Sequence, residues 1–249
     1  MEFTGYDYKE RKKKVKEILE NTDAVQKVKK FPRDEDFTYN NAYKAWAGAI
    51  FVDLRNSTDL FKKPDLEIAK VIRGFTSEII EILRKDTDDT SLKEIGIRGD
   101  CVYAVYSTPK QSDIYDIANR SYYINTYMKM LNKLLKESNL PQIKAGIGLA
   151  TQETLAVKAG RKSSGINNLV WIGDSVAKAA KLSDLGNKEG INPIVMSSTF
   201  HYNYKQAKLA KTQLDFWTEV NDSNYGTYYH GNVVKTEFDN WIKDGMKEE

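Results

Sequence analysis

Two aspartates stand where apolar segments run into tight turns. Asp53 ends an apolar run within FVDLRNST, residues 51–58, and Asp100 lies in the turn Arg98-Gly99-Asp100 between two short apolar segments. A buried carboxylate is costly unless a cation offsets its charge. Two carboxylates meeting at one sheet edge would suit a pair of divalent metal ions. Taken singly, each aspartate fits equally well as an ordinary strand-end or turn residue.

The turn after Asp53 adds a second feature, a place for a phosphate. Asn56, Ser57 and Thr58 are typical turn or helix-capping residues. Free backbone N–H groups at the start of a helix bind anions. The two features together predict a site for a metal-bound phosphate ester.

Apolar spacing predicts the elements that carry these residues. Helices are expected at 8–30 (ended by Pro32), 65–85, 114–138, 175–184, 198–211 and 237–243. Strands are expected at 47–54, 92–97, 101–106, 142–150, 154–159, 168–172, 193–197 and 228–234. The central order β-α-β-β-α-β is that of an α+β, ferredoxin-like fold, in which the first strand lies beside the hairpin. Asp53 and Asp100 would then meet. Residues 1–44 are expected to be a helical extension of the main domain, residues 45–249.

Composition narrows the function classes. With 41% hydrophobic and 29% charged residues, the chain has an ordinary globular composition. The only cysteine, Cys101, cannot form an internal disulfide and is expected to be a small core residue. One cysteine and two histidines argue against zinc. No signal peptide or spanning segment is evident, so a cytoplasmic protein without a membrane partner is expected.

Basic residues gather near the start of the chain. They occur in 9–17 and 27–30, while the net charge is only +3. The pattern fits the solvated face of a helix, and the alternative is a patch for polyanions. No nucleic-acid-binding signature accompanies it, so no nucleic-acid partner is expected.

The acidic motifs resemble those of the class III nucleotidyl cyclases. FVDLRNST is similar to the family's first metal motif, and IRGDCVYAVY, residues 97–106, to its second. GDSVAKAAKL, residues 173–182, is similar to its third motif with two changes. The resemblance covers about residues 46–197, with the three motifs in the family's order, and their combination is specific.

The resemblance implies roles for particular residues and a two-metal cyclisation of a nucleoside triphosphate, with two Mg²⁺ or Mn²⁺ ions per site. By this resemblance, the metal ligands are Asp53, Asp100 and the Leu54 carbonyl. The phosphate-binding residues are Arg55, Asn56, Ser57 and Thr58. Lys181 stands where the family has an arginine that neutralises phosphate charge. Ala177 replaces an asparagine that orients the ribose, a role that the neighbouring Lys178 is an alternative candidate to fill. In this family the metal ligands and the third motif of one site come from opposite subunits. The resemblance therefore implies a homodimer with two shared sites.

The base-reading positions depart from the purine pattern. Gly96 stands where adenylate cyclases have a lysine, and Val170 where they usually have an aspartate. Arg98 and Trp171 are candidates for a different base pocket, with a solvated turn residue and core packing as the respective alternatives. These features resemble the Pycsar-type pyrimidine cyclases of bacterial anti-phage defence. That resemblance implies CTP or UTP as substrate and a separate effector activated by the cyclic nucleotide.

Three other functions remain open. One is a purine cyclase with an unusual pocket. Another is a cyclase-like module that binds a nucleotide without turnover, which Ala177 favours. The third is a ferredoxin-like RNA-binding domain, which would carry exposed aromatic side chains on its central strands. Residues 47–52 instead have the composition of a buried strand.

Overall fold

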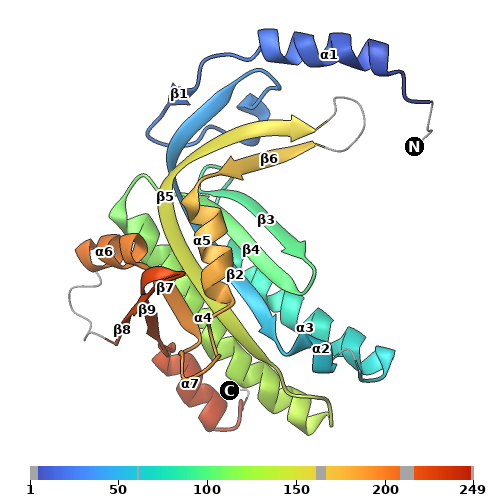
Figure 1. Ribbon diagram of the computed structural model, residues 1–249. Coiled ribbons are helices and arrows are strands. Elements are labelled where there is room, and N and C mark those ends of the chain that lie inside the picture. The colour runs from blue at the N-terminus through green and yellow to red at the C-terminus, as the bar shows by residue number, and fades with distance from the viewer. Residues whose placement is uncertain (1–4, 61, 161–166, 208–215, 248–249) are drawn as a thin grey trace.

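The structure is a computed structural model that describes residues 5–60, 62–160, 167–207 and 216–247. Nine described strands form one sheet (Figure 1). The strands are β1 Gln26–Lys27, β2 Ala42–Arg55, β3 Leu92–Arg98, β4 Cys101–Ser107, β5 Lys144–Gly160, β6 Asn167–Ile172, β7 Ile194–Ser197, β8 Thr218–Asp222 and β9 Gly226–Gly231. The helices are α1 Tyr8–Glu20, α2 Ser57–Leu60, α3 Asp65–Arg84, α4 Gln111–Glu137, α5 Asp174–Ser183, α6 Ser198–Gln206 and α7 Thr236–Lys243, with a 3₁₀ turn at Asp34–Asp36.

The central elements follow the order expected from the sequence. The chain runs β2-α3-β3-β4-α4-β5, and the strands lie in the order β3-β4-β2-β5-β7-β9-β8. β2 is antiparallel to both β4 and β5. The first strand therefore lies beside the hairpin, as in ferredoxin-like folds. The expected α+β class is confirmed.

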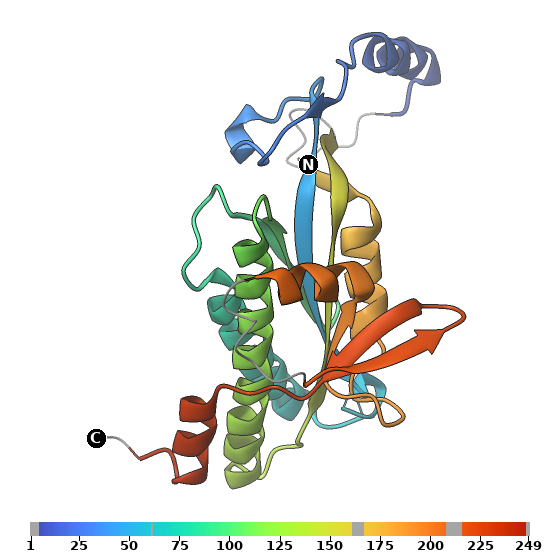
Figure 2. The same ribbon diagram turned by 90° about the vertical axis from the view of Figure 1, so that its left-hand side faces the viewer.

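Helices cover both faces of the sheet, as Figure 2 shows edge-on. α3 and α4 cover one face because their apolar residues recur at helical spacing. In α3 the buried side chains are Val71, Phe75, Ile79 and Leu83, and they pack with Ile50, Val52 and Leu54 of β2. α5 covers part of the opposite face, which also carries Asp53.

The close approach of α5 depends on two glycines of β5. A Cβ on Gly146 would lie 2.1 Å from the Ser183 carbonyl oxygen. A Cβ on Gly148 would lie 2.0 Å from the Ala179 carbonyl oxygen. Any side chain at either position would push the helix away from the sheet. These two glycines therefore allow the short distance between α5 and β5.

The first helix is shorter than expected. It ends at Glu20 rather than at residue 30, because the chain beyond it pairs with the sheet. β1 pairs with the start of β2, and Phe31 and Phe37 are buried against the sheet. The Lys93 ammonium group, with a fully buried side chain, ion-pairs with Asp34 at 2.9 Å. The helix α1 buries no residue, and Figure 1 shows it standing apart from the body.

Two strand predictions were wrong. Segments 142–150 and 154–159 form one continuous strand, because the polar residues between them pair with the long β2, Gln152 with Ala47 and Glu153 with Trp46. β8 was missed, since its short polar sequence is extended only through pairing with β9. The predicted helix at 198–211 ends at Gln206, and residues 208–211 lie outside the described part of the chain. No helix in the described ranges combines the length and apolarity needed to cross a membrane.

Candidate active site

The two aspartates lie at the same end of neighbouring strands. Asp53 of β2 is directly opposite Cys101 of β4, and Asp100 is the next residue in the turn. Opposed residues of antiparallel strands have Cα atoms about 4.5–5.5 Å apart. The register therefore brings the two aspartates together, as the sequence predicted. Asp100 follows Gly99, whose φ of 63° suits glycine in this turn.

Arg55 has a position that the sequence did not predict. Its guanidinium group donates a hydrogen bond to the Asp53 carboxylate and another, of 2.7 Å, to the Asp184 backbone carbonyl. Asp184 is the C-terminal cap of α5, and the Arg55 side chain is only 5% exposed. Arg55 thus connects the first aspartate to the end of α5. The structure places this expected phosphate ligand inside the protein, between two protein partners.

The turn that follows Asp53 is open to solvent. Asn56 adopts a left-handed conformation with φ 56° and starts the short helix α2. Asn56 and Thr58 are exposed and Ser57 is half-buried, while the Leu54 side chain lies in the core. A shallow hollow of about 290 Å³ adjoins Asn56 and includes Lys63 and Lys144 in its lining. Positive charge beside this turn suits a phosphate.

The helix α5 presents Ala177 and Lys181 one turn apart on its exposed side. Residues four apart on a helix share a face. Lys178 is half-buried and points elsewhere, since its ammonium nitrogen lies 3.9 Å from where a Cβ on Gly226 would stand. The structure therefore groups Lys181 with Ala177 and directs Lys178 toward the β8–β9 hairpin.

The expected base-reading residues lie on β3 and β6. Gly96 and Arg98 share a face of β3, and the exposed Arg98 guanidinium carbon lies 6.0 Å from the Tyr103 ring centroid. On β6, Val170 is 42% exposed, whereas Trp171 is half-buried and faces the opposite side of the strand. Gly96, Arg98 and Trp171 are thus on one face of the sheet, the face of Asp53, and Val170 is not.

Sequence reasoning missed Glu94 and Tyr103 in this region. Tyr103 is directly opposite Gly96, and Glu94 accepts hydrogen bonds from both the Tyr103 hydroxyl and the Trp171 indole. Alternation along β3 was a usable signal, because Glu94, Gly96 and Arg98 must share one face of a strand. The contact to Trp171 had no such signal.

Comparison with known proteins identifies the relatives. No protein-family model matches the chain. A uridylate cyclase of Treponema porcinum is 44% identical over 97% of this chain and 82% of its own length. A uridylate cyclase of Gulbenkiania mobilis is 32% identical over 96% of this chain and 97% of its own. A solved class III adenylyl cyclase-like ATP-binding protein from Pseudomonas aeruginosa superposes with a TM-score of 0.67 at 12% identity, over 94% of this chain and 48% of its own.

The chain belongs to the uridylate cyclase family. The near-complete match to two uridylate cyclases decides this, and the structural likeness agrees at the level of the fold. The expected family, the cyclase reaction class and the α+β fold are therefore confirmed.

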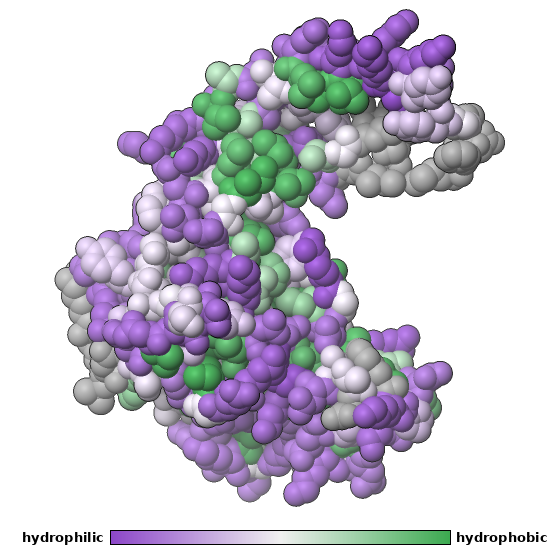
Figure 3. Space-filling model, viewed as in Figure 1, coloured by the Kyte–Doolittle hydropathy of each residue, from purple (hydrophilic) through white to green (hydrophobic). Residues whose placement is uncertain are grey.

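The surface of the cyclase is concave on the side that carries α5. Figure 3 shows the arm formed by the ends of β5 and β6 overhanging the body. Apolar side chains gather on the arm and on α1 in this view. The exposed apolar residues of α1, β2 and β6 include Val15, Ile18, Leu19, Trp46, Val170 and Ile172, each at least 41% exposed.

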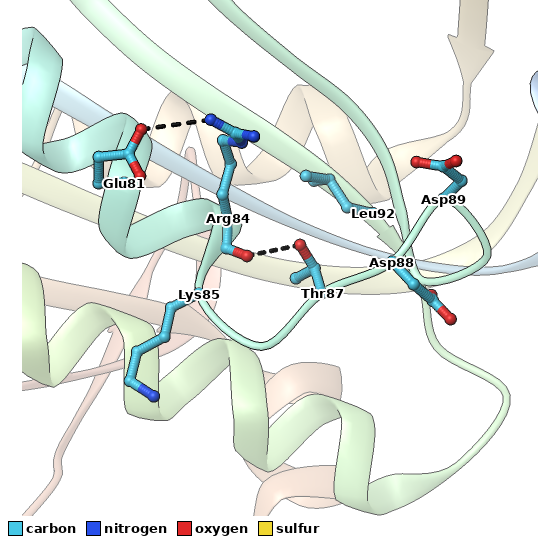
Figure 4. A pocket seen from close by; sticks show the side chains of 7 residues that line it. All are labelled: Glu81, Arg84, Lys85, Thr87, Asp88, Asp89 and Leu92. Atoms are coloured by element: carbon cyan, nitrogen blue, oxygen red, sulfur yellow. Dashed lines mark hydrogen bonds and ion pairs between the residues drawn. The ribbon is translucent and has the colours of Figure 1, made fainter.

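Two other features of the cyclase lie outside the chemistry. A hollow of about 290 Å³ between α3 and β3 is drawn in Figure 4, where Arg84 ion-pairs with Glu81 and the Thr87 hydroxyl donates to the Arg84 carbonyl. It adjoins Leu92, at the opposite end of β3 from Asp100. Burial raises the pKa of Cys101 to about 12, so the thiol stays protonated and fits the expected packing role.

Proposed function

We propose that this cyclase converts UTP to 3′,5′-cyclic UMP and pyrophosphate. The register of β2 against β4, with Asp53 opposite Cys101, carries the chemical part of the proposal because it brings two carboxylates to one edge. The base follows from the two uridylate cyclase relatives. Gly96 supports it, since a glycine has no side chain that could hydrogen-bond a purine edge.

Asp53 and Asp100 would hold two divalent cations, Mg²⁺ or Mn²⁺, with the Leu54 carbonyl as a further ligand. The residues fit such ions: carboxylate and carbonyl oxygens are the donors that hard cations prefer. Asp53 already has a cationic partner in Arg55, and among the described residues Asp100 has no ion-pair partner. Bound ions would lower the pKa of the ribose 3′-hydroxyl and offset the charge of the triphosphate.

The other residues would bind and orient the substrate. Backbone N–H groups of 56–58, next to the basic hollow, would hold phosphate oxygens. The Lys181 ammonium group would neutralise charge on the phosphate as the bond to pyrophosphate breaks, without the bidentate geometry of an arginine. The Ala177 side chain cannot hydrogen-bond the ribose. The ribose would instead be oriented by the metal ions and by the triphosphate to which it is attached.

The cyclase would act as a homodimer in which each site takes Asp53 and Asp100 from one subunit and Lys181 from the other. The concave side of the molecule and the apolar arm support this arrangement. A two-fold axis gives two equivalent sites. By resemblance to the Pycsar cyclases, the product would act in the cytoplasm as an anti-phage signal for a separate effector.

The substrate test incubates the protein with each of the four nucleoside triphosphates and Mn²⁺, and separates the products by chromatography. We expect UTP to yield cyclic UMP and pyrophosphate. Asp53→Ala and Asp100→Ala should abolish the product. Asp89→Ala is the matched control, because Asp89 is exposed in the α3–β3 loop. Consumption of ATP or GTP alone would refute the pyrimidine assignment.

Complementation tests the shared sites. Asp53→Ala and Lys181→Ala are each expected to be inactive, but an equimolar mixture should recover about a quarter of the wild-type activity. Half of the dimers are then mixed, and each mixed dimer has one intact site. The double variant mixed with wild type provides the control, since its mixed dimers have no intact site. A mixture as inactive as its components would exclude sharing between subunits.

One residue favours a second candidate, a module that binds the nucleotide without turnover. Ala177 lies exposed on α5 where a ribose-orienting side chain is expected, and its methyl side chain has no polar atom. This candidate predicts UTP binding by calorimetry, weakened by Asp53→Ala, and no cyclic product with any triphosphate.

A further inference from the structure

Three side chains from three strands meet on the face of the sheet that carries Asp53. The Tyr103 hydroxyl of β4 donates a hydrogen bond to one carboxylate oxygen of Glu94 on β3. The Trp171 indole N–H of β6 donates to the other oxygen at 2.6 Å. These three residues form the Glu94 cluster. Both oxygens of Glu94 are engaged by protein donors, so this carboxylate serves to hold its neighbours.

Tyr103 is fixed on several sides. Its ring stacks on Phe51, with centroids 5.0 Å apart and an interplanar angle of 13°. A Cβ on Gly96 would lie 2.8 Å from the Tyr103 hydroxyl oxygen and 2.9 Å from two ring carbons. The tyrosine therefore occupies the space of a side chain at position 96. Burial, followed by the hydrogen bond to Glu94, raises the pKa of Tyr103 to about 12, so its hydroxyl remains a donor.

Trp171 is fixed in a comparable way. Its ring packs edge-to-face on Phe31, with centroids 5.1 Å apart. The tryptophan follows Val170, the second expected base-reading position. Glu94 thus joins the ring that fills the space at position 96 to the ring beside position 170. These contacts bridge residues 77 positions apart in the chain.

We propose that Glu94 is a positioning residue that sets the shape of the base pocket, holding Tyr103 and Trp171 so that the pocket accepts a pyrimidine and excludes the larger purine. This inference rests on the proposed function. A pyrimidine lacks the second ring of a purine, so the position of two aromatic walls can select between them. In this proposal Glu94 acts through the two rings that it holds, by its hydrogen bonds from Tyr103 and Trp171.

Glu94→Ala tests the inference through steady-state kinetics with UTP and ATP. Without the carboxylate, each ring loses the hydrogen bond that helps to fix its position. We expect KM for UTP to rise about tenfold while kcat stays within about threefold, and the preference for UTP over ATP in kcat/KM to fall about tenfold or more. Tyr103→Phe, which removes one hydrogen bond and keeps the ring, should give a smaller change in the same direction.

Two variants distinguish a positioning role of Glu94 from an effect of its negative charge and from a nonspecific effect of substitution. Glu94→Gln keeps both bonds, with its carbonyl oxygen accepting from Trp171 and its amide donating to Tyr103, and should restore wild-type kinetics. Glu153→Ala is the matched control, because Glu153 lies on the other face of the sheet and ion-pairs with Lys27 and Lys44. It should leave base preference unchanged.

Several results would overturn the inference: an unchanged UTP preference in Glu94→Ala, a loss of kcat at constant KM, or Glu94→Gln as impaired as Glu94→Ala. If the wild type forms no cyclic UMP, the proposed function fails by itself. Calorimetric affinities for UTP and ATP then decide the Glu94 question, since a positioning role predicts the same loss of preference in binding.

Discussion

Gly148→Ala should move α5 and impair the cyclase in a measurable way. The new Cβ would stand 2.0 Å from the Ala179 carbonyl oxygen and 2.3 Å from the Ser183 nitrogen. Ordinary contact begins at 3.4 Å, so the helix must retreat by about 1.4 Å. Overpacking of this kind costs about 1–3 kcal/mol. Because α5 carries Lys181, a displacement of about 1 Å should also lower turnover about 100-fold.

Urea unfolding followed by circular dichroism measures the stability loss, and formation of cyclic UMP measures turnover. Gly74→Ala is the matched control. Gly74 lies within α3, and the nearest atom to its added Cβ is the side-chain methyl carbon Cδ1 of Leu131 at 3.3 Å, which can turn aside. Alanine there should be neutral or stabilising. If Gly148→Ala unfolded at the wild-type urea midpoint and kept its turnover, the close packing of α5 against Gly148 of β5 would be refuted.

Three further outcomes are expected. Arg55→Met should destabilise the protein by about 1–3 kcal/mol, since it leaves Asp53 without its cation, and urea midpoints should show a smaller loss with Mn²⁺ present; an equal loss with and without Mn²⁺ would contradict the metal role. Lys181→Arg should keep most of the turnover that Lys181→Ala loses, and equal rates for the two would show that the charge is not used. Asp239→Asn should lower the urea midpoint at pH 7. Hydrogen bonds from its two lysine partners lower the pKa of Asp239, so the stability it contributes is present above the unfolded pKa near 3.9 and lost on acidification; a gap that persisted at pH 2–3 would contradict this.

Local features of the fold and of the site could be predicted from residue patterns. The periodicities predicted the β-α-β-β-α-β order because a helix and a strand each repeat on their own period. The turn after Asp53 and the turn at Asp100 were predictable because turn conformations depend on a few adjacent residues. The end of α1, the continuity of β5 and the existence of β8 were not predictable, since each depends on pairing with a distant strand.

Most contacts between side chains of the site could be known only from the packed sheet. Register places Asp53 opposite Cys101, turns the Arg55 guanidinium toward the end of α5, and brings Glu94 within reach of Trp171. A one-residue slip would send every side chain of a strand to the other face. The alternation of residue types in the sequence specifies which residues of one strand share a face. Which residues of different strands lie opposite one another depends on the packing of the whole sheet.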